Sequence, residues 1–240
     1  MMNPKPRIET CFSPSLLHLY DISESIVVII DVFRATSTMA AALEQGALEI
    51  IPVSKVEECI ALGASMSNTI TAGERDGKVA PGLQHGNSPL EYPRSFIEGK
   101  RMVLTTTNGT RLLHMCSGAA EIITGSFLNL GAVCEYLQQQ KKNVLLACAS
   151  WKDRYNLEDS LFAGAVYQTV ASHFEMNCDS TRAAAHLYRA AQADLYGFIQ
   201  DSSHFLRLSK FGLQGDMEYC CRTNAHNVLV KLQEGTLKAF

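Results

Sequence analysis

The segment 26–30, with the sequence Ile-Val-Val-Ile-Ile, constrains the fold of this chain more than any other feature. It is an unbroken run of β-branched residues without polar alternation, which is typical of a strand buried on both faces. Strands of this kind belong to parallel sheets that helices cover on both sides. The segment therefore predicts that the chain folds around such a sheet.

Apolar, strand-like segments alternate with helical ones up to about residue 173. We expect strands at 7–12, 26–30, 48–53, 69–72, 102–104, 121–124 and 143–148, and helices at 38–45, 55–63, up to 113, at 128–139 and at 157–173. This alternation predicts an α/β fold with a mostly parallel sheet, helices on both faces and right-handed crossovers. A long Gly- and Pro-rich loop is expected at 73–89, and long loops in compact domains are often functional.

The last part of the chain has a different pattern. Residues 180–222 are largely helical in pattern, and 228–232 has the composition of a last strand. The helical section is therefore expected as an insert before that strand. We expect a single α/β domain over residues 1–240, with an arrangement in two lobes as the alternative.

Composition and charge argue against several classes of function. A net charge of −3 without a basic cluster argues against nucleic-acid binding. No apolar run approaches the roughly 20 residues of a membrane span, and the N-terminus has no apolar signal region. We therefore expect a cytoplasmic protein with a small-molecule ligand and neither nucleic acid nor membrane as partner. A homo-oligomer stays open.

A carboxylate, a guanidinium and three hydroxyls directly follow the buried strand. They are Asp31, Arg34, Thr36, Ser37 and Thr38. A carboxylate at the end of a strand suits a divalent cation such as Mg²⁺, whereas a guanidinium and a hydroxyl-rich helix start suit an oxyanion. Alternatively, Asp31 and Thr36 cap the turn and Arg34 pairs with Asp31, and this segment alone does not decide between the two.

Three further polar clusters also follow predicted strands. They are the segment 73–76 with Glu74 and Arg75, the segment 105–110 with Asn108 and Thr110, and the loop before Leu157. The carboxyl ends of parallel strands lie along one edge of a sheet, where open α/β folds bind their ligands. Several clusters at one edge favour a composite anion-plus-metal site over scattered caps.

The individual clusters still allow structural roles. Glu158 and Asp159 open a helix, where acidic residues stabilise the helix dipole by about 0.3–1 kcal/mol, but they could equally hold Mg²⁺. The turn with Asn108 and Thr110 could aim backbone N–H groups at a phosphate or simply cap the next helix. Among the histidines, His85 and His204 lie in polar contexts that could reach the site.

Cys148 and Arg154 have the spacing C-x₅-R after a strand, by which a thiolate phosphatase places its nucleophile and its phosphate-binding arginine. Asp153 lies inside this loop, and its charge would oppose both a thiolate and a phosphate. The eight cysteines are scattered and most lie in apolar segments, which favours reduced core residues. A Cys148-dependent phosphatase is therefore kept only as an alternative.

Five motifs along the chain resemble, in order, those of the 2-phosphosulfolactate phosphatase (ComB) family. They are IDVFRATSTMAAALEQGA, GERDGK…GNSP, LTTTNGTR, LEDSLFAGA and SSHFLRLSKFGLQGDMEYC, and they extend from about residue 8 to residue 222. The resemblance implies an α/β fold with a parallel-sheet core. It also implies Mg²⁺-dependent hydrolysis of the phosphate ester of 2-phospho-3-sulfolactate, in coenzyme M biosynthesis.

The chain departs from the family pattern at two places. The family usually has a glycine-containing loop after the position of Cys148, where this chain has the segment 150–154. Near the C-terminus the family tends to have Asp where Asn224 stands and Val-Pro where Val230-Lys231 stands. The C-x₅-R spacing is not a family motif.

Together these observations predict a Mg²⁺-dependent phosphomonoesterase that acts on 2-phosphosulfolactate or a related 2-hydroxy-acid phosphate. The predicted metal ligands are Asp31, Glu74, Glu158 and Asp159, and the predicted catalytic residues are Asp31, Arg34 and Glu74. The predicted substrate-binding residues are Arg34, Thr36, Ser37, Thr38, Arg75, Asn108 and Thr110. The nucleophile stays open between Asp31, a hydroxyl and metal-bound water. A protein that binds an anionic metabolite without turnover is a further alternative.

Overall fold

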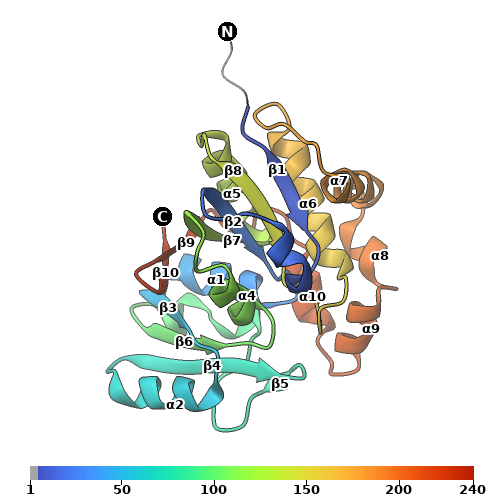
Figure 1. Cartoon of the computed structure of the whole chain (residues 1–240). Coiled ribbons are helices and arrows are strands. Elements are labelled where there is room, and N and C mark those ends of the chain that lie inside the picture. Colours follow the sequence, from blue (N-terminus) through green and yellow to red (C-terminus); the bar gives the residue numbers. More distant parts are fainter. Residues whose placement is uncertain (1–4) are drawn as a thin grey trace.

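The computed structural model describes residues 5–240, and a ten-stranded sheet forms the centre of that part of the chain (Figure 1). Four strands form one parallel group: β1 (Ile8–Cys11), β8 (Asn143–Cys148), β2 (Ser25–Ile30) and β7 (Glu121–Gly125). Three strands form a second: β3 (Glu49–Pro52), β6 (Arg101–Thr105) and β4 (Thr69–Arg75). The antiparallel hairpin of β9 (Val230–Gln233) and β10 (Thr236–Ala239) joins the two groups, and β5 (Lys78–Val79) borders β4.

The twist of the sheet decides where the two parallel groups end. The pairs β7–β9, β9–β10 and β10–β3 are all antiparallel, so in a flat sheet the two groups would run in opposite directions. Neighbouring strands rotate by roughly 20–25°, which amounts to about 120–150° over the steps from β2 to β4. This rotation offsets most of the reversal, and the carboxyl ends of both groups contribute to one pocket.

The strand β2 is buried on both faces, as its sequence predicts. Ile26, Val28 and Ile30 belong to one apolar core with helices α5 (Leu130–Gln138) and α6 (Leu157–Val170). Val27 and Ile29 belong to a second core on the opposite face, with α1 (Ala35–Glu44) and α4 (Gly109–Met115). On the second parallel group, α2 (Val56–Ser65) packs against β4 and β6, and the short α3 (Arg94–Ile97) precedes β6. The predicted α/β architecture with helices on both faces is confirmed.

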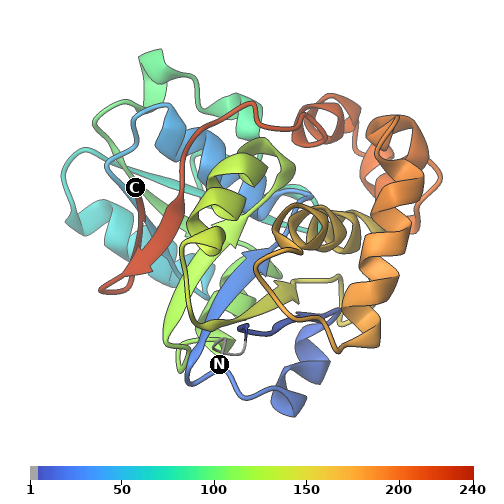
Figure 2. The same ribbon diagram turned by 90° about the horizontal axis from the view of Figure 1, so that it is seen from above.

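The helical section lies between α6 and the last hairpin, as the sequence predicts. It consists of α7 (Asp179–Ala191), α8 (Leu195–Ile199), α9 (Ser203–Ser209) and α10 (Gln214–Cys220), drawn in orange and red in Figures 1 and 2. Ala184, Ile199, Phe205 and Met217 from these helices enter the same core as Ile26 and Ile30. The section therefore packs on one face of the first parallel group. No helix within residues 5–240 is long and apolar enough to cross a membrane.

The sequence did not predict the two hairpins. The expected loop at 73–89 instead continues β4 to Arg75 and returns as β5, through a turn at Asp76 and Gly77 with positive φ values of 53° and 82°. The chain also continues past β9 into β10, through Glu234 and Gly235 with φ values of 49° and 81°. Both turns have φ above zero at two successive residues, the backbone of a tight hairpin turn. Neither Glu234 nor its neighbours form the Asn-Gly or Asp-Gly signal, so β10 was missed.

The contact between α6 and α7 requires glycine at position 164. A Cβ atom built on Gly164 would lie 2.1 Å from the carbonyl oxygen of Ala184, which belongs to the backbone of α7. We therefore expect Gly164→Ala to lower the free energy of unfolding by about 1–3 kcal/mol in urea denaturation. Gly215→Ala in α10 is the control, because the added methyl group meets no atom within 4 Å there. A Gly164→Ala protein as stable as the parent would contradict this packing.

Candidate active site

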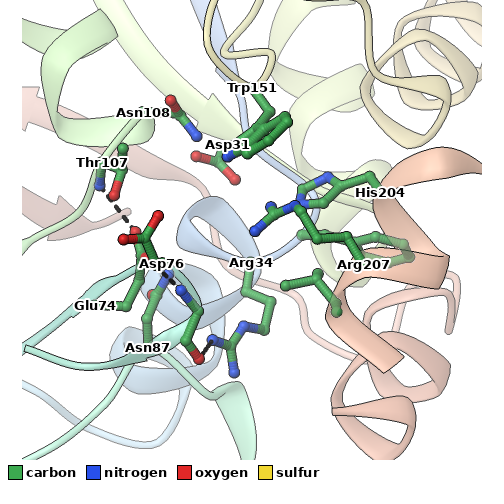
Figure 3. A pocket seen from close by; sticks show the side chains of 13 residues that line it. Asp31, Arg34, Glu74, Asp76, Asn87, Thr107, Asn108, Trp151, His204 and Arg207 are labelled. Atoms are coloured by element: carbon green, nitrogen blue, oxygen red, sulfur yellow. Dashed lines mark hydrogen bonds between the residues drawn. The ribbon is translucent and has the colours of Figure 1, made fainter. Parts of the chain in front are cut away.

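A pocket lies where β2, β4, β6 and β8 end, beside α9 of the helical section (Figure 3). Both parallel groups and α9 contribute to it. The pocket is lined by Asp31, Phe33, Arg34, Glu74, Asp76, Gly77, Asn87, Thr107, Asn108, Trp151, His204, Arg207 and Leu208. The structure thus brings together the predicted residues Asp31, Arg34, Glu74 and Asn108.

Asp31 directly follows β2 and is almost completely buried. The pKa of its carboxyl group is raised to about 6, mainly by burial. His204 and the N–H of Ala35 oppose this shift, and the nearby carboxylates of Glu74 and Glu158 add to it. The pocket therefore gathers like charges around a buried acid. A bound cation would relieve that repulsion.

Glu74 comes from β4, in the other parallel group, and the backbone fixes its carboxylate. Its Oε1 accepts a hydrogen bond from the N–H of Thr107 (2.9 Å), and its Oε2 accepts one from the N–H of Gly77 (3.0 Å). Each oxygen keeps a free lone pair. The Glu74 carboxylate is therefore held at the pocket wall by the turns after β4 and β6.

Arg34 is paired with Asp216 of α10 and not with Asp31. Its Nη1 lies 2.5 Å from Oδ2 of Asp216, whose Oδ1 accepts a hydrogen bond from the Ser88 hydroxyl (2.8 Å). Arg34 and Asp216 are both buried. The proposed pairing of Arg34 with Asp31 is therefore absent, and Asp216 does more than start a helix.

The hydroxyls of Thr36, Ser37 and Thr38 do not reach the pocket. Thr36 Oγ1 accepts from the N–H of Asp31 (3.1 Å), and Ser37 Oγ donates to the carbonyl oxygen of Val32 (2.9 Å). Thr38 Oγ1 donates to the carbonyl oxygen of Asn87 (3.0 Å). All three side chains are buried at the start of α1. They fix the turn that carries Asp31 and Arg34.

Two further predicted binding residues also lie outside the pocket. The guanidinium of Arg75 donates to Thr105 Oγ1 (2.9 Å) and to the carbonyl oxygen of Glu74 (2.7 Å), and it is turned away from the lining. Thr110 is buried, and its hydroxyl donates to the carbonyl oxygen of Thr106 (2.9 Å). Of the segment 105–110, Thr107 and Asn108 line the pocket.

Asp159 links the segments that follow β2 and β8 through hydrogen bonds. Its Oδ1 accepts from the N–H of Val32 after β2 (2.9 Å), and its Oδ2 accepts from the N–H of Ser150 after β8 (3.2 Å). Burial, reinforced by the charges of Glu158 and Asp31, raises the pKa of Asp159 well above its usual value. Asp159 does not line the pocket.

Glu158 lies behind His204. Its Oε1 forms a short contact with Nδ1 of His204, and its Oε2 is buried without a hydrogen-bond partner. Among residues 5–240 the structure shows no group of three or more His, Cys, Asp or Glu side chains arranged to hold a metal ion. The predicted four-carboxylate metal set is therefore not assembled, and Asp31 and Glu74 are its two members in the pocket.

The polar and aromatic residues that sequence reasoning missed include Trp151, His204 and Arg207 in the pocket wall and Asp216 behind Arg34. His204 was considered because of its polar context, and the structure places it in the pocket wall. His204 and Arg207 are three residues apart on α9, which puts them on one helix face. That spacing is the signal that could have found Arg207. His85, by contrast, packs on Phe96, and its ring centroid lies 4.8 Å from the Phe96 centroid.

Cys148 is not placed for nucleophilic chemistry. The thiol is buried in the apolar core and does not line the pocket. Burial, with a smaller contribution from the charge of Asp159, raises its pKa well above the usual value. A reactive cysteine requires the thiolate, so the geometry opposes the Cys148-dependent alternative.

Comparison with known proteins identifies the family of this fold and site. Residues 11–235 match the 2-phosphosulpholactate phosphatase family. The chain belongs to that family. A probable 2-phosphosulfolactate phosphatase of Caldanaerobacter subterraneus subsp. tengcongensis is 36% identical, covering 91% of this chain and 92% of the relative. Proteins described in the same words are 40% identical in Thermotoga petrophila (89% and 92%) and 31% identical in Clostridium perfringens (97% and 96%). The resemblance of the five motifs is thereby confirmed.

The raised pKa of Asp31 predicts a pH-dependent stability in the metal-free protein. The folded-state pKa of about 6 lies above the unfolded value, so folding favours the protonated acid. This contribution is present in full below about pH 4 and is lost as the pH rises through about 6. As the pH rises from about 4 to about 6, the parent loses this contribution and Asp31→Asn does not. The free energy of unfolding of Asp31→Asn minus that of the parent should therefore rise by up to about 2 kcal/mol.

Urea denaturation in EDTA measures this difference. Asp201→Asn is the control, because Asp201 is exposed outside the pocket, and its stability relative to the parent should stay constant over the same range. A constant difference for Asp31→Asn as well would contradict the raised pKa.

Proposed function

We propose that this chain is a Mg²⁺-dependent phosphomonoesterase that hydrolyses 2-phospho-3-sulfolactate, or a closely related 2-hydroxy-acid phosphate, to sulfolactate and phosphate. The observation that carries the proposal is the pocket itself, in which Asp31 and Glu74 face the cationic and histidine side chains of the opposite wall. Membership of the 2-phosphosulpholactate phosphatase family and the names of the relatives support the substrate. The product sulfolactate would serve coenzyme M biosynthesis.

Asp31 and Glu74 fit a magnesium ion. Mg²⁺ commonly binds through one or two carboxylates together with water and substrate phosphate oxygens. The mutual repulsion of the acids around Asp31 and the free lone pairs of Glu74 support this donor set. When bound, the ion would neutralise the phosphate oxygens and favour attack on phosphorus.

Arg34 supplies a fixed positive charge at the pocket wall. Its pairing with Asp216 and its contact with the carbonyl oxygen of Gly77 (3.4 Å) hold the guanidinium in one place. A buried charge that is already oriented needs little reorganisation when it binds a dianionic ester. Arg34 is therefore proposed to orient the substrate, while Asp216 positions Arg34.

His204 is proposed as the proton donor for the leaving group. In hydrolysis a bond forms between the attacking oxygen and phosphorus, the ester P–O bond breaks, and the alkoxide of the product takes up a proton. Glu158 holds Nδ1 of His204, which leaves Nε2 for the pocket. The attacking oxygen belongs to water or to the Asp31 carboxylate, and both remain candidates.

Phosphate release from 2-phosphosulfolactate tests the proposed function. We expect release that excess EDTA abolishes and added Mg²⁺ restores. Asp31→Asn should lower kcat by about 100-fold or more, because it removes a charge that stabilises the transition state, with circular dichroism unchanged. Asp201→Asn, which alters an exposed acid outside the pocket, is the matched control. Release that EDTA does not affect, or full activity of Asp31→Asn, would refute the proposal.

A further inference from the structure

The two arginines that line the pocket differ in their partners. Arg34 forms an ion pair with Asp216. For Arg207 the structure shows no hydrogen bond or ion pair within residues 5–240, and its Nε is buried without a partner. A buried, unsatisfied donor is costly, so native structures usually supply a partner from protein, water or ligand.

Arg207 lies over the ring of Trp151. The central carbon of the guanidinium lies 4.4 Å from the centre of the Trp151 ring, which is a cation–π distance. Stacking occupies the face of the planar guanidinium and leaves its N–H groups, which lie in the plane, free to donate. Figure 3 shows Arg207 extending from α9 toward the middle of the pocket. The guanidinium N–H groups of Arg207 are therefore available to a ligand in the pocket.

The loop that carries Trp151 is held in an uncommon conformation. Ser150, Lys152 and Asp153 have φ values of 56°, 51° and 59°, in the left-handed region that non-glycine residues rarely occupy. Neighbouring segments keep the loop in place. Asp159 accepts from the N–H of Ser150, and Arg111 pairs with Asp153 at 3.0 Å. Such conformations persist only where the surroundings enforce them, and they cluster at ligand sites.

We propose that Arg207, stacked on Trp151, binds a tetrahedral oxyanion of the substrate, either the phosphoryl or the sulfonate group. The planar fork of arginine matches two oxygens of such a group with parallel charge-assisted hydrogen bonds. The Arg207 guanidinium, which lines the pocket, then gains the anionic partner that residues 5–240 do not supply. The inference rests on the proposed function for the identity of the substrate, but anion binding at Arg207 can be measured without turnover.

Trp151 is the only tryptophan of the chain, so its fluorescence reports on this contact directly. We would titrate the full-length protein with inorganic phosphate and, separately, with methanesulfonate, both in EDTA. At least one of the two anions should change the Trp151 emission in a saturable way. Arg207→Gln should weaken that binding by about tenfold or more, and Arg207→Lys, which keeps the charge but loses the fork, should weaken it less.

Arg222→Gln is the matched control. Arg222 also stacks on an aromatic ring, with its central carbon 5.2 Å from the centre of Tyr219, but it is exposed and outside the pocket. It should bind both anions like the parent. Weakened binding of phosphate in the Arg207 variants would assign the phosphoryl group, and weakened binding of methanesulfonate would assign the sulfonate.

Unchanged binding of both anions in Arg207→Gln and Arg207→Lys, or no anion response in the parent protein, would overturn the inference. If Arg207→Gln loses anion binding and the parent protein releases no phosphate from 2-phosphosulfolactate, the inference is upheld and the proposed function is refuted. KM values for 2-phosphosulfolactate and 2-phospholactate give an independent check. If Arg207 binds the sulfonate, its substitution raises KM for 2-phosphosulfolactate only. If Arg207 binds the phosphoryl group, its substitution raises KM for both substrates.

Discussion

The β9–β10 hairpin is the constraint on which the site depends. It joins two parallel groups of strands by three successive antiparallel pairs, and only the accumulated twist of the sheet brings both sets of carboxyl ends to one pocket. Asp31 comes from the first group and Glu74 from the second. The two carboxylates are thus neighbours because of the geometry of the whole sheet.

The helical section completes the pocket from the other side. The buried pair of Arg34 and Asp216 ties α10 to the turn after β2. Removing one partner of a buried pair leaves an uncompensated charge and commonly costs about 3–5 kcal/mol, although the pair itself need not stabilise the fold. The pair is therefore better understood as a device that fixes where the helical section lies. It also places α9, with His204 and Arg207, in the pocket wall.

Much of the sheet could be predicted from the sequence because its signal is local. The unbroken apolar run at 26–30 predicts that β2 is buried on both faces. Asp31 and Glu74 could be predicted because each lies at the carboxyl end of an apolar strand. The β10 strand was missed because its turn, at Glu234 and Gly235, lacks a recognised hairpin pair. Strand order and direction depend on contacts between distant segments, which periodicity does not report.

The direction of each polar side chain was harder to predict than its position. Thr36 and Thr38 follow β2 as closely as Arg34 does, yet they turn into the protein and bind backbone groups. Asp159 was a candidate metal ligand, but the rotation of α6 directs it to two backbone N–H groups. Arg207 comes from a segment more than 170 residues after Asp31, and only the packing of the helical section reveals their proximity.

Titration of the substrate-free protein with Mg²⁺ in a calorimeter tests most directly whether the two halves of the sheet form one metal site. If they do, Asp31→Asn and Glu74→Gln should each weaken Mg²⁺ binding by about tenfold or more, since each removes a charged ligand, while Asp201→Asn should bind like the parent. The Mg²⁺ affinity of the double variant should be only slightly lower than that of the single variant that binds Mg²⁺ less tightly, because both carboxylates act on the same ion. Equal Mg²⁺ affinity in the parent and in both single variants would contradict the account.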